Sequence, residues 1–105
     1  MSKILGDEEV KRIIEHRILS DSKDKEIFKG CKLKRGSKPK YEEFTFEKDS
    51  FGRYTVCNVE GHVAVIRTSG DAWLLSKPGR KAFSAKISYP DGKIMKMIWQ
   101  PCERV

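Results

Sequence analysis

Apolar residues in the N-terminal quarter of the chain follow a helical spacing. The residues concerned are Val10, Ile13, Ile14 and Ile18. Side chains that recur every three or four positions lie on one face of an α-helix. The acidic residues of this segment stand in its first turn, where the helix dipole favours negative charge. The pattern predicts an amphipathic helix over about 7–19.

A second, shorter helix is predicted directly after the first. Ser22 is a favourable N-cap residue, and Gly30 has the backbone freedom that commonly ends a helix. The helix would run from Ser22 to Phe28. We expect Ile27 and Phe28 to close against the first helix or against the sheet.

From Tyr41 onward, apolar and polar residues alternate with the period of a β-strand. The predicted strands cover about 41–47, 53–59, 62–68, 81–89 and 94–99, and Trp73, Leu74 and Leu75 are candidates for a further short strand. Residues expected to share a face are Phe44 with Phe46, Tyr54 with Val56, Val63 with Val65, and Phe83 with Ala85, Ile87 and Tyr89. Glu60-Gly61 predicts a tight hairpin turn, and Pro90-Asp91-Gly92 predicts the turn before the last strand.

Closely spaced strands without intervening helices predict an antiparallel meander, because parallel strands need long crossover connections. The expected fold class is α+β, with an N-terminal amphipathic helix or helical pair packed on a five- or six-stranded antiparallel sheet. A small, partly open barrel is the alternative. A chain of 105 residues has room for one hydrophobic core. We therefore expect a single domain over 1–105, with a helical part at 1–28, a basic loop at 29–40 and the sheet at 41–105.

Composition favours a folded chain and excludes a membrane-spanning one. The charged fraction is high, at 35%, but aromatic residues make up 10% and supply the large apolar groups that disordered chains lack. No apolar run approaches the roughly 20 residues that cross a bilayer. Cys31, Cys57 and Cys102 are odd in number and widely separated, without the close pairs of zinc sites or disulfide frameworks. We expect reduced thiols in a soluble, cytoplasmic protein that needs no cofactor.

Positive charge is concentrated in a few segments. The net charge is +7, and the basic loop at 29–40 holds six cations and no acidic residue. Such a group repels itself unless a partner neutralises it, and backbone phosphates would do so. The alternative is a solvated linker whose charge only maintains solubility. A second basic segment, the basic turn at 76–81, follows the same argument.

The hairpin after the basic turn adds three lysines, Lys86, Lys93 and Lys96. Lys86 is out of phase with the apolar residues of its strand and should point away from the core. Lys96 does so too if Met95, Met97 and Trp99 form the inner face, and Ile94 and Ile98 are then partly exposed beside it. The predicted nucleic-acid-binding residues are Lys29, Lys32, Lys34, Arg35, Lys38, Lys40, Lys77, Arg80, Lys81, Lys86, Lys93 and Lys96.

Aromatic residues near turns have two possible roles, base stacking and core packing. Phe51, Tyr54, Trp73 and Tyr89 could stack on unpaired bases. Aromatic residues in so small a domain more often belong to the core.

Residues suited to catalysis are few. His16 is expected on the surface of the first helix, and His62 follows Glu60, so that a Glu–His pair near cations would be the minimal requirement for a metal-independent ribonuclease. No phosphate-binding glycine loop, nucleophile elbow or zinc-protease motif is present. We therefore do not expect an enzyme.

Three functions remain. The leading hypothesis is a small basic protein that binds DNA or RNA through its basic loops and the lysine-bearing hairpin. The alternative is an inhibitor or adaptor that docks on an acidic protein surface, of the kind found among phage and mobile-element accessory proteins. The third is a ribonuclease-like toxin that uses His62.

Overall fold

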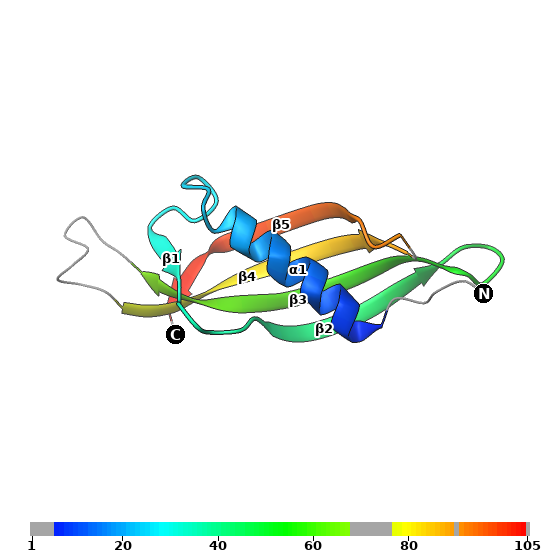
Figure 1. Cartoon of the computed structure of the whole chain (residues 1–105), viewed down its shortest axis with the longest axis horizontal. Helices are drawn as coiled ribbons and strands as arrows, with labels where there is room; N and C mark the ends of the chain where they lie inside the picture. Colours follow the sequence, from blue (N-terminus) through cyan, green and yellow to red (C-terminus); the bar gives the residue numbers. More distant parts are fainter. Residues whose placement is uncertain (1–5, 68–76, 90, 105) are drawn as a thin grey trace.

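A computed structural model describes residues 6–67, 77–89 and 91–104 and confirms the α+β class. One helix packs on a curled five-stranded antiparallel sheet that forms a half-barrel, and the molecule is elongated, with extents of 56 × 22 × 21 Å (Figure 1). The elements are α1 (Asp7–Asp21), β1 (Cys31–Leu33), β2 (Lys40–Lys48), β3 (Tyr54–Arg67), β4 (Lys77–Ser88) and β5 (Ile94–Arg104). The expected strand at Trp73, Leu74 and Leu75 lies outside the described residues.

Helix α1 confirms the first predicted helix and extends it to Asp21. Its buried residues include Val10, Ile14 and Ile18, as the spacing predicts. The second predicted helix is wrong, because Ser22 is the C-cap of α1 and residues 22–30 form turns. The carboxylate of Asp24 accepts a hydrogen bond from the Glu26 backbone N–H at 2.9 Å, and the Phe28 N–H donates to the Asp24 carbonyl at 3.0 Å, so the chain makes a single turn here that ends before Gly30, whose φ is positive.

Strands β2 to β5 form the predicted meander, and β1 is added beside it. Strand β4 pairs with β3 along 56–67, so β1 and β2 must share the opposite edge of β3. Strand β2 pairs with β3 up to His62, and β1 pairs with its last three residues. The predicted basic loop at 29–40 is therefore wrong in part, because it contains β1, and only residues 34–39 connect the two strands that lie end to end on one edge.

The predicted hairpin turn at Glu60-Gly61 is wrong, because β3 runs straight through both residues. A Cβ atom on Gly61 would lie 2.2 Å from the backbone oxygen of Lys40 and 3.0 Å from the ring of Phe83. The register of β2 also shifts opposite this position. Gly61 thus permits a close approach of two backbones inside a strand, which is a second common use of glycine.

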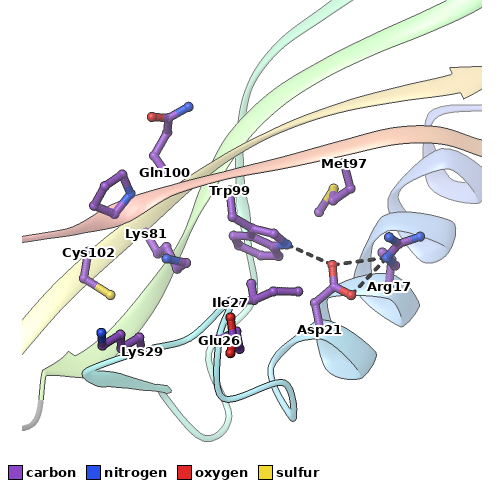
Figure 2. A pocket seen from close by; sticks show the side chains of 11 residues that line it. Arg17, Asp21, Glu26, Ile27, Lys29, Lys81, Met97, Trp99, Gln100 and Cys102 are labelled. Atoms are coloured by element: carbon purple, nitrogen blue, oxygen red, sulfur yellow. Dashed lines mark hydrogen bonds and ion pairs between the residues drawn. The ribbon is translucent and has the colours of Figure 1, made fainter.

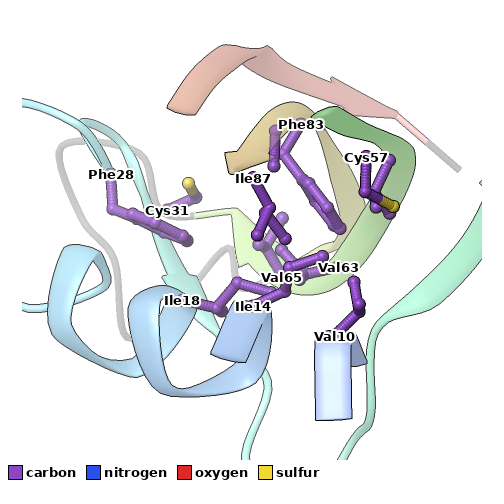
Figure 3. Close-up of a cluster of buried hydrophobic side chains, with 12 residues drawn as sticks. Val10, Ile14, Ile18, Phe28, Cys31, Cys57, Val63, Val65, Phe83 and Ile87 are labelled. Atoms are coloured by element: carbon purple, nitrogen blue, oxygen red, sulfur yellow. The ribbon is translucent and has the colours of Figure 1, made fainter. Parts of the chain in front are cut away.

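The hydrophobic core lies between α1 and the inner face of the sheet, which is the face toward the helix (Figure 3). The buried apolar residues are Val10, Ile14, Ile18, Phe28, Cys31, Cys57, Val59, Val63, Val65, Phe83, Ala85 and Ile87. Phe28 is buried in this cluster and Ile27 packs against it, as predicted. The short helix that was predicted to carry both residues is absent.

Strand β5 follows the predicted inner face only in part. Met97 and Trp99 pack against the core, whereas Met95 is 61% exposed, and Ile94, expected on the outer face beside Lys96, packs against the core instead. The cause is a register shift, since Ile94 lies opposite Ile87 while Lys96 lies opposite Lys86. Met95 is the extra residue of this bulge, and a bulge changes the phase of the strand before it.

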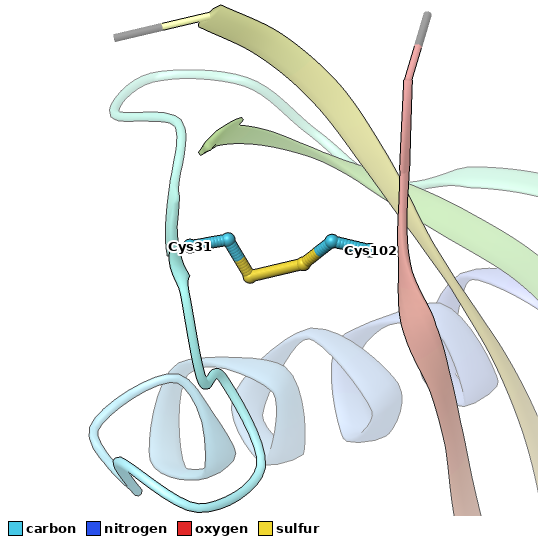
Figure 4. The surroundings of a disulfide bond; sticks show 2 residues. All are labelled: Cys31 and Cys102. Atoms are coloured by element: carbon cyan, nitrogen blue, oxygen red, sulfur yellow. A yellow bond between two sulfur atoms is a disulfide. The ribbon is translucent and has the colours of Figure 1, made fainter. Parts of the chain in front are cut away.

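Cys31 and Cys102 form a disulfide between β1 and β5 (Figure 4). The expectation of reduced thiols is therefore wrong for these two residues, and the cytoplasmic location stays a prediction. Cys57 is free and buried in the core, where burial raises the pKa of its thiol. Strands β1 and β5 lie at the two ends of the strand order, so the bond closes the curl of the sheet. No helix in the described ranges is long and apolar enough to cross a membrane.

Candidate nucleic-acid interface

The tertiary structure brings the basic loop and the basic turn together at one end of the sheet. Strand β3 pairs with β1 on one edge and with β4 on the other, so Cys31, Arg67 and Lys77 stand in one row. The backbone N–H of Lys34 donates to the carbonyl of Ala64, and Ala64 lies opposite Arg80. We name this group of cations the basic end; its members are Lys32, Lys34, Arg67, Lys77 and Arg80.

Three members of the basic end lie on the outer face of the sheet, away from α1. In β1, Cys31 is buried while Lys32 is exposed, and Lys34 is exposed just beyond the strand. In β4, Arg80 alternates with buried neighbours and is exposed. Neighbouring strands are about 4.8 Å apart, so the backbones of β1 and β4 are separated by about 10 Å.

The remaining cations of the basic loop surround this row. Residues 34–37 form a turn in which the Ser37 side-chain hydroxyl donates to the Lys34 carbonyl at 2.8 Å. Arg35 and Lys38 are exposed in this connection, and Lys40 is exposed at the start of β2. Lys29 is exposed on the turn before β1. The loop therefore presents its charge to solvent, as both the phosphate-binding interpretation and the solvated-linker interpretation require.

The lysine-bearing hairpin lies elsewhere. Lys86 and Lys96 stand opposite each other and are exposed, which agrees with their predicted outward direction, and Lys93 is exposed nearby. Lys86 is six residues from Arg80 along β4, or about 20 Å. Its ammonium group also lies 3.7 Å from the carboxylate of Glu47. The structure thus joins two of the three predicted basic groups and leaves the third apart.

Lys81 has to be removed from the predicted interface. It lies on the inner face of β4 and is only 4% exposed. Lys81 was expected in the basic turn at 76–81, but β4 begins at Lys77, so Lys81 continues the inward alternation of Phe83, Ala85 and Ile87.

Arg67 is the member of the basic end that sequence analysis missed. A Cβ atom on Gly79 would lie 2.8 Å from the aliphatic stem of Arg67, so the glycine leaves room for this side chain. Arg67 lies opposite Lys77 only because β3 pairs with β4. The one local signal of this contact in the sequence is the Pro78-Gly79 pair.

Acidic side chains reduce the positive charge on the rest of the outer face. Glu103 lies 3.4 Å from Arg80, but both side chains are more than half exposed, and such pairs are weak. Toward the middle of the sheet, exposed Glu43 and Glu60 stand opposite each other. Positive charge therefore dominates at the basic end and is balanced beyond it.

His62 does form a Glu–His pair, but with Glu42 and not with Glu60. Nδ1 of His62 is hydrogen-bonded to the Glu42 carboxylate on the outer face. In the pairing of β2 with β3, His62 lies opposite Lys40. His16 is exposed on α1, as expected. Across 6–67, 77–89 and 91–104, no three His, Cys, Asp or Glu side chains are grouped so that they could hold a metal ion.

The candidate stacking aromatics gather at the other end of the molecule. Tyr54, Tyr89 and Phe46 contact one another, with ring centroids 5.0 to 5.9 Å apart. Phe51 is 81% exposed and lies under the Arg53 guanidinium, and Trp73 lies outside the described residues. Tyr54 is ten residues from Ala64 along β3, or about 33 Å from the basic end.

Searches against family models, curated proteins and solved structures find no match to this chain.

Proposed function

We propose that the protein binds the phosphate backbone of DNA or RNA through the basic end. The observation that supports this is the register of β3, which sets Lys34 and Arg80 in one row from segments far apart in the sequence. Cations at this spacing repel one another, and nucleic-acid phosphates would neutralise them while releasing condensed counterions.

The expected mode of binding is independent of base sequence. Phosphate contacts position a protein on nucleic acid, whereas base contacts read its sequence. The basic end offers lysine and arginine side chains, and the exposed aromatic residues lie about 33 Å away. We therefore expect similar affinities for oligonucleotides of different sequence.

Titration with labelled duplex and single-stranded oligonucleotides tests this proposal. If all five cations contact phosphates, the log–log slope of affinity against salt should be about −4.5 on duplex DNA and about −3.5 on single strands. Replacing Lys34 and Arg80 together by Ala should make that slope shallower by up to about 2.

The matched control replaces Lys86 and Lys96 together by Ala, which removes the same charge from the same face about 20 Å away. This control should leave the slope nearly unchanged. Failure to bind either oligonucleotide more tightly than about 10⁻⁴ M at 0.1 M salt would contradict the proposal.

The second candidate function is docking on an acidic protein surface. It is favoured by Ile66, which is 36% exposed and lies in register between Lys32 and Pro78. An apolar residue inside a cationic patch is common at protein interfaces and contributes little to phosphate contacts. This function takes precedence if the basic end proves to have no affinity for oligonucleotides.

A further inference from the structure

A cleft of about 570 Å³ lies on the opposite side of the sheet from the outer face, between β5 and the end of α1 (Figure 2). Its walls come from four parts of the chain: α1, the turns at 22–30, β4 and β5. The lining residues are Arg17, Asp21, Glu26, Ile27, Lys29, Lys81, Met97, Trp99, Gln100, Pro101 and Cys102. This volume lies within the range of small-molecule sites, roughly 300–1,000 Å³.

Lys81 is the unusual residue of this cleft. It is 4% exposed, and its ammonium group lies 5.5 Å from the centroid of the Phe28 ring. Within the part of the chain that the structure describes, this ammonium has no hydrogen-bond acceptor and no carboxylate partner, and its nitrogen still reaches solvent in the cleft. A buried lysine normally has a counterion, because burial penalises its charged form. That desolvation lowers the pKa of Lys81.

The nearby carboxylate of Asp21 is already occupied. It accepts hydrogen bonds from Nε of Arg17 at 3.0 and 3.1 Å and from the indole N–H of Trp99 at 2.8 Å. Trp99 also packs against Phe28 and Phe83, with centroids 5.0 and 5.6 Å apart. Asp21 thus fixes the indole as a rigid wall of the cleft and leaves Lys81 without a counterion.

Charge and surface chemistry together define the ligand. The cleft contains three cations, Arg17, Lys29 and Lys81, and two carboxylates, Asp21 and Glu26, which leaves one positive charge unmatched. Its apolar walls are formed by Ile27, Met97, Trp99 and Pro101. A singly charged anion with an apolar body satisfies both features, whereas a phosphate dianion would leave an excess negative charge.

We propose that this cleft binds a small organic monocarboxylate, whose carboxylate pairs with the Lys81 ammonium while its apolar body packs against the Trp99 indole. The site is separate from the basic end, because Lys81 faces inward and Arg80 faces outward on the same strand. Its occupancy therefore does not depend on whether the protein binds nucleic acid.

The test compares three probes by ligand-observed NMR: 4-phenylbutyrate, its uncharged amide of the same shape, and 3-phenylpropyl phosphate as the dianion, with phenyl phosphate as its shorter analogue. The intact protein, with its disulfide formed, should bind the carboxylate about tenfold or more tightly than the amide, because only the carboxylate supplies the missing counterion. The variant Lys81→Met should lose this preference and keep weak binding of both probes. It should fold, since replacing an unpaired buried charge by an apolar side chain removes a desolvation cost.

Lys86→Met is the matched control, because Lys86 lies on the same strand, is exposed on the outer face and stands outside the basic end. This variant should retain the preference for the carboxylate. Equal affinity for acid and amide in the wild type, a preference that survives in Lys81→Met, or tighter binding of either phosphate would each overturn the proposal.

Discussion

At the scale of single residues, Gly61 decides the course of β3. Its hydrogen faces the Lys40 carbonyl at a distance that no side chain tolerates, since an added Cβ would stand 2.2 Å away. The obstacle is backbone, which cannot move aside as a flexible side chain could. The glycine therefore couples the start of β2 to the middle of β3.

Replacing Gly61 by Ala should consequently destabilise the fold by about 1–3 kcal/mol, the usual range for overpacking. Urea denaturation followed by circular dichroism measures the change in the free energy of unfolding. Gly6→Ser is the control, because nothing lies within 4 Å of a Cβ atom at that position and serine is a favoured residue at this N-cap of α1. Equal stabilities of the two variants would show that the strands separate here at little cost.

His62 provides a second test at this scale. The Glu42 carboxylate and the His62 imidazole are hydrogen-bonded to each other on the open outer face. The described part of the sheet has no further histidine beside them. A metal-independent ribonuclease needs both a general base and a general acid in a cleft that holds the reacting phosphate. Purified protein should leave mixed RNA intact, and His62→Ala should behave like the wild type. RNA cleavage that disappears in this variant would place the protein among the ribonuclease-like toxins.

At the scale of elements, Tyr41 connects β2 to α1. Its hydroxyl lies 3.2 Å from the backbone oxygen of Lys11 and 3.4 Å from the Glu15 carboxylate, and it can donate to either. Burial raises the pKa of Tyr41 well above its usual value, and the negative charge of Glu15 raises it further. The hydrogen bond therefore requires the protonated phenol.

Tyr41→Phe should lower the stability by about 1 kcal/mol at neutral pH, the net contribution of one hydrogen bond. Above pH of about 10, an unfolded tyrosine loses its proton while the folded Tyr41 keeps it. Unfolding of the wild type then releases a proton, so its stability decreases with pH by a term that the variant lacks. Urea titrations at neutral and alkaline pH should show the two stabilities converging; a constant difference would contradict this assignment.

At the scale of the whole molecule, the disulfide links the two ends of the strand order. Cys31 and Cys102 are 71 residues apart. Closing a loop of this length lowers the entropy of the unfolded chain and raises its free energy by about 4 kcal/mol. The bond also joins β1, which is only three residues long, to the longer β5. The short edge strand is thereby held to the rest of the half-barrel.

Reduction should therefore decrease the free energy of unfolding by up to about 4 kcal/mol. Urea denaturation with and without a thiol reductant measures this loss. The double variant Cys31→Ser with Cys102→Ser is the control, and its midpoint should not respond to reductant. An identical midpoint for oxidised and reduced wild type would show that the bond does not constrain the unfolded chain.

Local patterns in the sequence determined much of this fold. The amphipathic spacing of Val10, Ile14 and Ile18 predicts α1, and the alternation around Phe83 and Ile87 predicts the inner face of β4. These predictions succeed because the periods of a helix and a strand are local properties, and burial of one face then selects the partner surface. The segregated charge of the basic loop is likewise visible in the sequence, and the structure leaves it exposed.

Other features were decided by tertiary structure alone. Gly61 resembles a turn residue in sequence, and only the approach of β2 shows that it lies inside a strand. Cys31 meets Cys102 because the sheet curls, and Lys81 is buried because β4 extends back to Lys77 and turns this side chain inward. Each of these outcomes depends on contacts between segments distant in the chain. Such contacts are set by register and curvature, which no local period encodes.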